Sequence, residues 1–170
     1  MEQKMKRTSP VLAAAFTAAV SLVSPALAGD FDGAYVGLGL TAGFNAPSVP
    51  DYEASAFIGY NWDFGNQMIA GGELDLTYNP NSLWAATPAA TTTFDGRLGY
   101  LAREDVMVYG RAGGGYTSGG PGSYVWDLGI GAEYMMQNGL TVRGEFDRVD
   151  PFETGMDTQV NGRLGVVMNF

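Results

Sequence analysis

Apolar residues recur with a period of two at the end of this 170-residue chain. Counting back from the terminal phenylalanine, every second residue is apolar or small: Phe170, Met168, Val166, Leu164, Gly162 and Val160. The residues between them include Asn169, Arg163 and Asn161. A period of two is that of a β-strand, whose successive side chains point to opposite faces. The pattern predicts a strand between lipid on one face and a small polar interior on the other.

The same alternation recurs along the chain. We count eight alternating segments, at residues 34–44, 53–64, 68–78, 94–100, 108–116, 124–134, 140–147 and 161–170. Three connections are short, at 65–67, 102–105 and 137–139, and four are longer, at 45–52, 79–92, 117–122 and 149–156. Short turns at one end and long loops at the other, with an even strand count, are typical of a transmembrane barrel. The sequence therefore predicts an all-β fold, an eight-stranded antiparallel up-and-down barrel.

The N-terminus reads as an export signal. Lys4, Lys6 and Arg7 precede an apolar run at 11–23, and Ala26-Leu27-Ala28 provides small residues at positions −3 and −1 of a cleavage site. The apolar run is shorter than the roughly 20 residues of a membrane-spanning helix. We therefore expect residues 1–28 to be a cleaved signal peptide and residues 29–170 to form one barrel domain.

Composition narrows the classes of function. The chain has no cysteine and no histidine, and its formal net charge is −9. Export without cysteine excludes a small disulfide-stapled secreted protein. The negative charge argues against nucleic acid as a partner, because phosphates would be repelled. Lysine is absent after residue 28, which is unusual for an acidic soluble protein of this size.

Alternation alone does not distinguish a membrane barrel from a soluble barrel whose apolar face points inward. The polar face carries both signs of charge. Its acids are Glu53, Asp63, Glu73, Asp75, Asp95, Asp127, Glu133, Glu145 and Asp147. Its bases are Arg97, Arg111, Arg143 and Arg163. Arginine rather than lysine indicates paired, partly buried carboxylates. The polar face is therefore predicted to be the interior, and most glycines lie on it, where an eight-stranded barrel has little room.

Aromatic residues of the apolar face gather at strand ends. Beside the short turns lie Tyr60, Trp62, Tyr100, Tyr134 and Phe170. Beside the long loops lie Phe44, Tyr78, Phe94, Tyr116 and Tyr124. Two aromatic belts separated by small aliphatic residues are what the two membrane interfaces favour. The belts favour a membrane barrel over a soluble one; recovery without detergent in the periplasmic fraction would instead indicate a soluble ligand carrier.

Several segments carry a family resemblance. They are Asp32-Gly-Ala-Tyr-Val-Gly, Gly96-Arg-Leu-Gly-Tyr100, Val108-Tyr-Gly-Arg-Ala-Gly-Gly and Gly129-Ile-Gly-Ala-Glu-Tyr134. The chain resembles the small outer-membrane β-barrel proteins of Gram-negative bacteria, which include the opacity proteins and related surface antigens. The resemblance implies localisation in the outer membrane, contact with its lipid and lipopolysaccharide, and delivery by the barrel-assembly machinery, which receives such chains through a terminal aromatic residue like Phe170.

Candidate chemistry is sparse. Known barrel hydrolases and acyltransferases resemble one another in using histidine with serine or aspartate as a base–nucleophile set, and histidine is absent here. Glu73 with Asp75, and Glu145 with Asp147, share a face and could do acid–base work, but similar carboxylates recur on most strands opposite arginines. Asp150, Glu153 and Asp157 cluster near the last loop without a recognised calcium-binding spacing. The sequence therefore predicts a non-enzyme with no catalytic, cofactor-binding or metal-binding residues.

The interior charges lead to the functional expectation. An eight-stranded barrel is just wide enough for side chains to fill, so arginines bonded to carboxylates would plug it. We expect a protein of envelope integrity or surface contact, acting through outward loops that carry Trp84 and the run 88–93. The alternative is a narrow channel for small solutes or cations, because nine interior acids face four arginines. The sequence does not identify a ligand for these loops.

Overall fold

The computed structural model describes residues 31–44, 51–79, 90–118, 122–153 and 158–170. The expected signal peptide, residues 1–28, lies outside these residues, as do Trp84 and Asp157. Across the described ranges, no helix combines the length and apolar character needed to span a bilayer.

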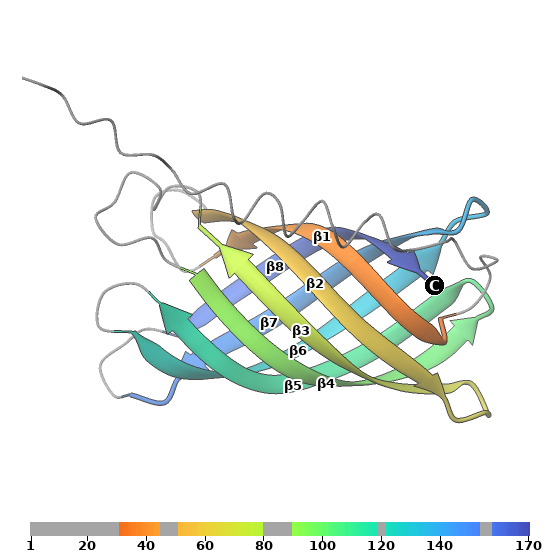
Figure 1. Ribbon diagram of the computed structural model, residues 1–170, viewed down its shortest axis with the longest axis horizontal. Coiled ribbons are helices and arrows are strands. Elements are labelled where there is room, and N and C mark those ends of the chain that lie inside the picture. Colours follow the sequence, from red (N-terminus) through yellow and green to blue (C-terminus); the bar gives the residue numbers. More distant parts are fainter. Residues whose placement is uncertain (1–30, 45–50, 80–89, 119–121, 154–157) are drawn as a thin grey trace, which may run out of the picture.

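Eight strands form one closed barrel (Figure 1). The strands are β1 (Gly33–Gly43), β2 (Asp51–Asp63), β3 (Met68–Tyr78), β4 (Ala90–Arg103), β5 (Val106–Ser118), β6 (Ser123–Met135), β7 (Leu140–Pro151) and β8 (Gln159–Asn169). Each strand pairs antiparallel with the next, and β1 closes on β8 with Val36 opposite Met168 and Leu40 opposite Leu164. The predicted fold class is confirmed.

The short turns gather at one end of the barrel, which also holds the C-terminus (Figure 1). Their backbones need left-handed conformations. Gly65, Asn66 and Gln67 all have positive φ angles in the β2–β3 turn, and Gly139 has one in the β6–β7 turn. Glycine and asparagine adopt this region most easily, so the sequence selects tight turns here. The resemblance to outer-membrane barrels implies that this end faces the periplasm and that the end with the long connections faces outward.

Every strand except β3 extends beyond its predicted bounds at one end or both, most of all β4 and β7. β4 begins at Ala90 and β7 continues to Pro151, whereas the alternation predicted 94–100 and 140–147. The threonine run, predicted for a loop, therefore lies in β4 from Thr91 to Thr93. The Thr91 and Thr117 hydroxyls share a hydrogen bond of 2.9 Å across β4 and β5. Threonine is β-branched and polar, so it continues a strand after the apolar pattern has ended.

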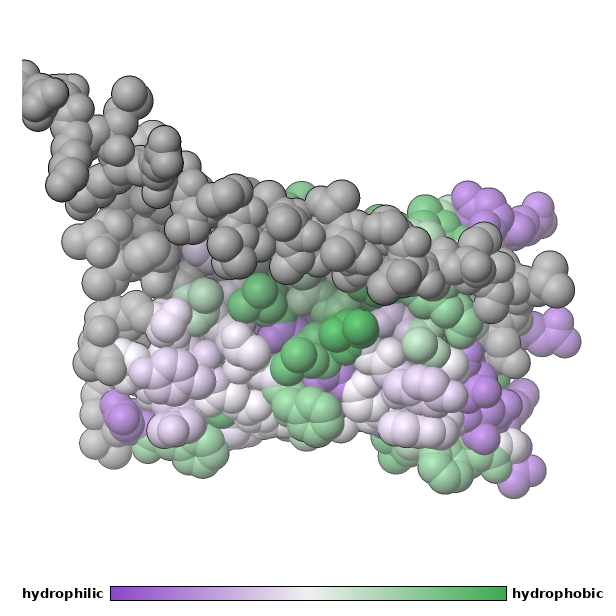
Figure 2. All heavy atoms as spheres, viewed as in Figure 1, coloured by the Kyte–Doolittle hydropathy of each residue, from purple (hydrophilic) through white to green (hydrophobic). Residues whose placement is uncertain are grey.

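The side chains face as the alternation predicted. Apolar side chains on the outer face are exposed, for example Leu164 and Ile130, and the charged side chains of the inner face are mostly buried. Figure 2 shows apolar residues over the middle of the visible wall and strongly hydrophilic ones at the short-turn end. Tyr60 packs on Trp62 in one aromatic belt, and Tyr116 packs on Tyr124 in the other. Of the ten residues predicted for the belts, Tyr78 and Phe170 are half-buried and the rest are exposed.

Candidate functional site in the barrel lumen

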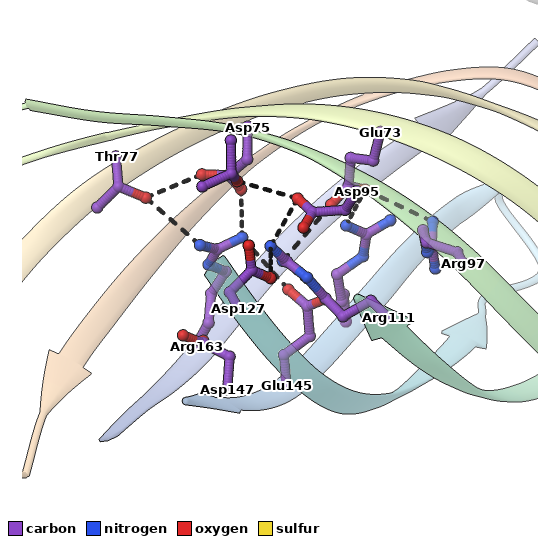
Figure 3. Close-up of polar contacts among 12 residues, drawn as sticks. Glu73, Asp75, Thr77, Asp95, Arg97, Arg111, Asp127, Glu145, Asp147 and Arg163 are labelled. Atoms are coloured by element: carbon purple, nitrogen blue, oxygen red, sulfur yellow. Dashed lines mark hydrogen bonds and ion pairs between the residues drawn. The ribbon is translucent and has the colours of Figure 1, made fainter. Parts of the chain in front are cut away.

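Four arginines from four strands meet carboxylates inside the barrel. Figure 3 labels three of them, Arg97, Arg111 and Arg163. They are Arg97 of β4, Arg111 of β5, Arg143 of β7 and Arg163 of β8. Each is buried, and the Arg143 side chain has no exposed surface at all. We call them and the carboxylates they bind the lumen network. All four were predicted from their positions on the polar face.

The half of the network nearer the short turns is centred on Arg143. Its Nη1 lies 2.5 Å from Glu73 Oε2 on the opposite wall, and its Nη2 lies 2.7 Å from Glu133 Oε1. Arg97 Nη2 binds the same Glu133 oxygen at 2.6 Å. Two arginines and two glutamates from β3, β4, β6 and β7 are thus joined across the lumen.

Aromatic side chains complete this half. The Tyr35 hydroxyl donates to Glu73 Oε2 at 2.8 Å and accepts from Arg97 Nη1 at 2.6 Å. The Arg97 guanidinium lies 4.0 Å from the centre of the Tyr109 ring, and that of Arg143 lies 4.2 Å from the centre of the Phe57 ring. Cation–π contacts are strongest where both groups are desolvated, as here. The rings therefore stabilise the buried guanidinium groups alongside the carboxylates.

Sequence reasoning missed these three rings as members of the network. The signal was present in the register: Tyr35 lies opposite Gly59, Phe57 opposite Gly37 and Tyr109 opposite Gly131. A Cβ at Gly59 would lie 2.3 Å from Tyr35 Cζ, and one at Gly131 would lie 2.4 Å from Tyr109 Cζ. Each glycine thus makes room for an inward ring on the neighbouring strand.

The extracellular half is centred on Arg111 and Arg163. Arg111 Nη2 binds Asp95 Oδ2 at 2.8 Å and Asp127 Oδ1 at 3.2 Å. Arg163 Nη1 binds Asp75 and lies 3.4 Å from Glu145 Oε2. Hydroxyl groups hold the aspartates: Thr77 donates to Asp75 and Thr93 donates to Asp95, both at 2.9 Å. Charged groups are therefore hydrogen-bonded as well as paired, as burial requires.

An apolar cluster lies at the periplasmic end of the lumen. Phe31, Ile69, Met107, Tyr109 and Met135 pack together there, all buried. Asn61 Nδ2 donates to the Phe31 carbonyl oxygen at 2.9 Å, which fixes the segment before β1 against the barrel. The alternating pattern does not predict this cluster, because Phe31 precedes the first alternating segment.

The interior contains more acid than base. Seven of the nine predicted carboxylates are buried: Glu73, Asp75, Asp95, Asp127, Glu133, Glu145 and Asp147. Of the other two, Glu53 is half-buried, and Asp63 is exposed at the end of β2, so its prediction as an interior charge was wrong. Asp127 Oδ2 and Asp147 Oδ1 receive no hydrogen bond from protein. Both residues line a polar pocket of about 30 Å³ near the extracellular end, enough for one or two waters.

The carboxylate pairs considered for catalysis bind arginines. Glu73 binds Arg143, and Asp75 binds Arg163. Glu145 lies between Arg111 and Arg163, and the Asp147 carboxylate accepts a hydrogen bond from Asn161 at 3.0 Å. Each acid has a structural partner in the described part of the chain.

In the acidic cluster near the last loop, formed by Asp150, Glu153 and Asp157, the described contacts of Asp150 are with protein groups. Asp150 binds Arg148 through both carboxylate oxygens, at 2.6 and 2.9 Å, and Thr158 also donates to it. Asp157 lies outside the described residues. Among the residues that are described, no group of three or more acids is placed to hold a metal ion.

Comparison with known proteins identifies the family. A sequence profile described as Outer membrane protein beta-barrel domain matches residues 12–170. The chain belongs to this family. It is an integral outer-membrane barrel, as its two faces predict, and contact with the lipid and lipopolysaccharide of that membrane follows from this location.

Relatives agree with this assignment. The 31 kDa outer-membrane immunogenic protein of Brucella melitensis biotype 1 is 28% identical over 156 residues, which cover 71% of this chain and 64% of that protein. The match thus spans less than two thirds of that relative.

Solved structures share the fold. Ail of Yersinia pestis has a TM-score of 0.61 at 13% identity, covering 81% of this chain and 97% of that one. The N-terminal barrel of Pseudomonas aeruginosa OprF has a TM-score of 0.62 at 15% identity, covering 84% and 99%. At these identities the likeness concerns the fold alone.

Proposed function

We propose that this protein is a non-enzymatic structural element of the outer membrane, with a lumen closed by arginine–carboxylate pairs. The observation that carries the proposal is the bridge from Glu73 through Arg143 to Glu133, which crosses the barrel with all three side chains buried. An eight-stranded barrel has an interior just wide enough for its own side chains to fill. Its role is then envelope integrity, or surface contact through the extracellular loops.

Both ends of the lumen support closure. The periplasmic end holds the apolar cluster around Phe31, which offers no polar path to an ion. In the extracellular half, Arg111 lies between Asp95 and Asp127 of its two neighbouring strands, and Arg163 of β8 binds Asp75 of β3 across the lumen. Opening a path would require separating buried ion pairs, which is costly because each group would lose its partner in a poorly hydrated interior.

The rival function is a narrow cation channel. It is favoured by the excess of seven buried carboxylates over four arginines, which makes the interior negative.

If the lumen is closed, we expect wild-type barrels in a planar bilayer to pass only small, cation-selective currents. The double variant Glu73→Ala/Arg143→Ala removes one bridge without leaving either charge alone, and we expect it to conduct more.

The recording separates the two functions. Large cation-selective currents in the wild-type protein, unchanged in the double variant, would establish a channel and contradict the closed lumen. Large anion-selective currents would contradict both functions, because the interior carries excess acid.

The absence of catalysis is also part of the proposal. The chain has no histidine to serve as a general base. The interior carboxylates that share a strand face are engaged by arginines or by Asn161. Since the fold itself hosts varied activities, the absence of catalysis is inferred from these side chains and not from the architecture.

The two candidate roles can be told apart in cells. We expect a strain lacking the protein to take up more of a hydrophobic fluorescent probe, because outer-membrane packing is weakened. Full-length protein should restore the barrier. A variant with residues 80–89 replaced by a Gly/Ser segment of equal length should also restore it if the barrel carries the function.

If the loops carry the function, the same replacement should abolish surface binding to host cells or matrix while leaving dye uptake at the wild-type level. A null strain with normal dye uptake and normal binding would contradict the proposed function.

Export and assembly follow from the same proposal. Residues 1–28 would direct export, and the terminal strand ending at Phe170 would be read by the barrel-assembly machinery. The Phe170 amide donates to the Ala34 carbonyl at 2.8 Å, so the terminal residue also takes part in closing β8 onto β1.

A further inference from the structure

A shallow apolar groove of about 1020 Å³ crosses the outer wall of the barrel. Small outward residues from five successive strands form its floor: Gly110, Ala132, Gly144, Gly162 and Ala42. They are contiguous because Ala132 lies opposite Gly144, and Gly162 lies opposite Ala42. Gly144 and Gly162 are diagonal neighbours, since the cross-strand partner of Gly162 is Phe146.

Larger side chains form the rims. At the extracellular end the rings of Phe44 and Phe146 stack with their centres 6.4 Å apart. At the other end Tyr100 donates to Gln67 of the β2–β3 turn at 2.7 Å, which places it in the periplasmic belt. The groove therefore runs obliquely from one aromatic belt to the other, through the apolar thickness of the membrane.

A flexible acyl chain fits this shape better than a second barrel does. The groove is narrow, one or two residues wide along each strand, and its floor lies below the surrounding Leu164 and Ile130 side chains, both of which are highly exposed. A second convex barrel wall would rest on these rims. A hydrocarbon chain can lie between them and make dispersion contacts along its length.

An outward-facing arginine marks the extracellular end of the groove. Arg148 follows Phe146 by two residues on the same face of β7, and its partner across the sheet is Val160, two residues from Gly162. Its side chain is 58% exposed, whereas that of Asp150, which binds it, is 11% exposed. The exposed member of the pair is thus the cation.

The guanidinium is held in one orientation. Asp150 accepts from Nε and Nη2, and Thr158 Oγ1 donates to Asp150 Oδ1 at 2.5 Å. The Nη1 edge of Arg148 makes no contact with this carboxylate. Arginine presents its donors in a fork that suits phosphate oxygens, and an orientation already fixed lowers the entropy lost on binding.

We propose that the groove and Arg148 form a binding site for a phosphorylated, acylated glycolipid of the outer leaflet, the chemistry of lipopolysaccharide. The phosphate binds the free edge of Arg148, and one acyl chain lies over Gly162 and Gly144. The site is on the outer wall, so it is independent of whether the lumen conducts.

Native mass spectrometry of refolded barrels in vesicles of phospholipid and lipopolysaccharide tests the site. Wild-type protein should retain one lipopolysaccharide in preference to phospholipid. Arg148→Gln removes the cation, and Gly144→Leu fills the floor, where a Cβ has room because its nearest neighbour, Leu164 Cδ2, would be 3.8 Å away. Each should reduce retention by about tenfold, as expected for one lost charge-assisted contact or its equivalent in packing.

Two matched controls should retain lipid at the wild-type level. Gly96→Leu is the same change on the same outer face but off the groove, with its Cβ 3.8 Å from the Ala112 carbonyl oxygen. Arg103→Gln removes an exposed arginine at the periplasmic turn. A heated and unheated gel comparison confirms that every variant is folded.

Three results would overturn the proposal. One is equal retention of phospholipid and lipopolysaccharide by the wild-type barrel. Another is unchanged retention in both Arg148→Gln and Gly144→Leu. The third is detection of dimers of the wild-type barrel that become monomers in Gly144→Leu, since this would make the groove an interface between copies of the chain.

Discussion

Replacing Arg143 by methionine should reduce the free energy of unfolding by about 3–5 kcal/mol, the loss typical when one partner of a buried ion pair is removed. Arg143 is fully buried and binds both Glu73 and Glu133, which keep almost no exposed surface. Methionine fills similar space but leaves the two glutamates with less compensation. Urea titration of the barrel in lipid vesicles, followed by tryptophan fluorescence, measures the change.

The control is Arg103→Met. Arg103 lies at the β4–β5 turn with its side chain 73% exposed and binds Asp105 at 3.1 Å. Exposed pairs of this kind contribute at most about 1 kcal/mol, so the variant should unfold close to the wild type.

A second variant tests the network directly. Glu73→Gln/Arg143→Met should cost less than the sum of the two single changes, because the two groups bind each other. Equal losses for Arg143→Met and Arg103→Met, or strict additivity in the double variant, would show that the lumen network does not stabilise the barrel.

The faces of the barrel could be predicted because they depend only on the period of two. Arg97, Arg111, Arg143 and Arg163 all point inward as the alternation indicates. The aromatic belts followed from the same rule, together with the preference of Tyr and Trp for membrane interfaces. Strand ends were harder to predict, since Thr91–Thr93 pair with β5 by hydrogen bonds that do not require an apolar pattern.

Pairing of interior arginines with carboxylates could be predicted from the sequence, but which arginine meets which carboxylate across the lumen could not. Arg143 and Glu73 are 70 residues apart and lie on strands that are not neighbours, so their contact depends on barrel closure and strand stagger. The inward Tyr35 and Tyr109 rings could have been foreseen once the register placed each opposite a glycine. Asp63 was misplaced because alternation continues to the strand end, where the lumen already meets solvent.

An arginine at Ile130 should destabilise the barrel by about 2–4 kcal/mol, as expected for a cation at the bilayer midplane. Ile130 is on the outer face of β6, 68% exposed, between the belt residues Tyr124 and Tyr134. The sequence alone predicts Leu128 as the residue of this strand near the bilayer midplane. The structure pairs Leu128 with the exposed Arg148, which places that row nearer the extracellular interface, so Ile130 is the deeper position.

Two controls separate the effect of a charge deep in the bilayer from the effect of substituting Ile130 as such. Ile130→Leu keeps the apolar surface and should unfold within about 1 kcal/mol of the wild type. Thr92→Arg puts the same charge on the outer face near the extracellular end of β4, where the cost falls to about 0–1 kcal/mol. If Ile130→Arg folds into vesicles and resists urea as well as Thr92→Arg does, the outer face does not contact lipid at this depth, and the assigned position of the barrel in the membrane is wrong. A penalty confined to Ile130→Arg instead locates the middle of the bilayer at this row of β6.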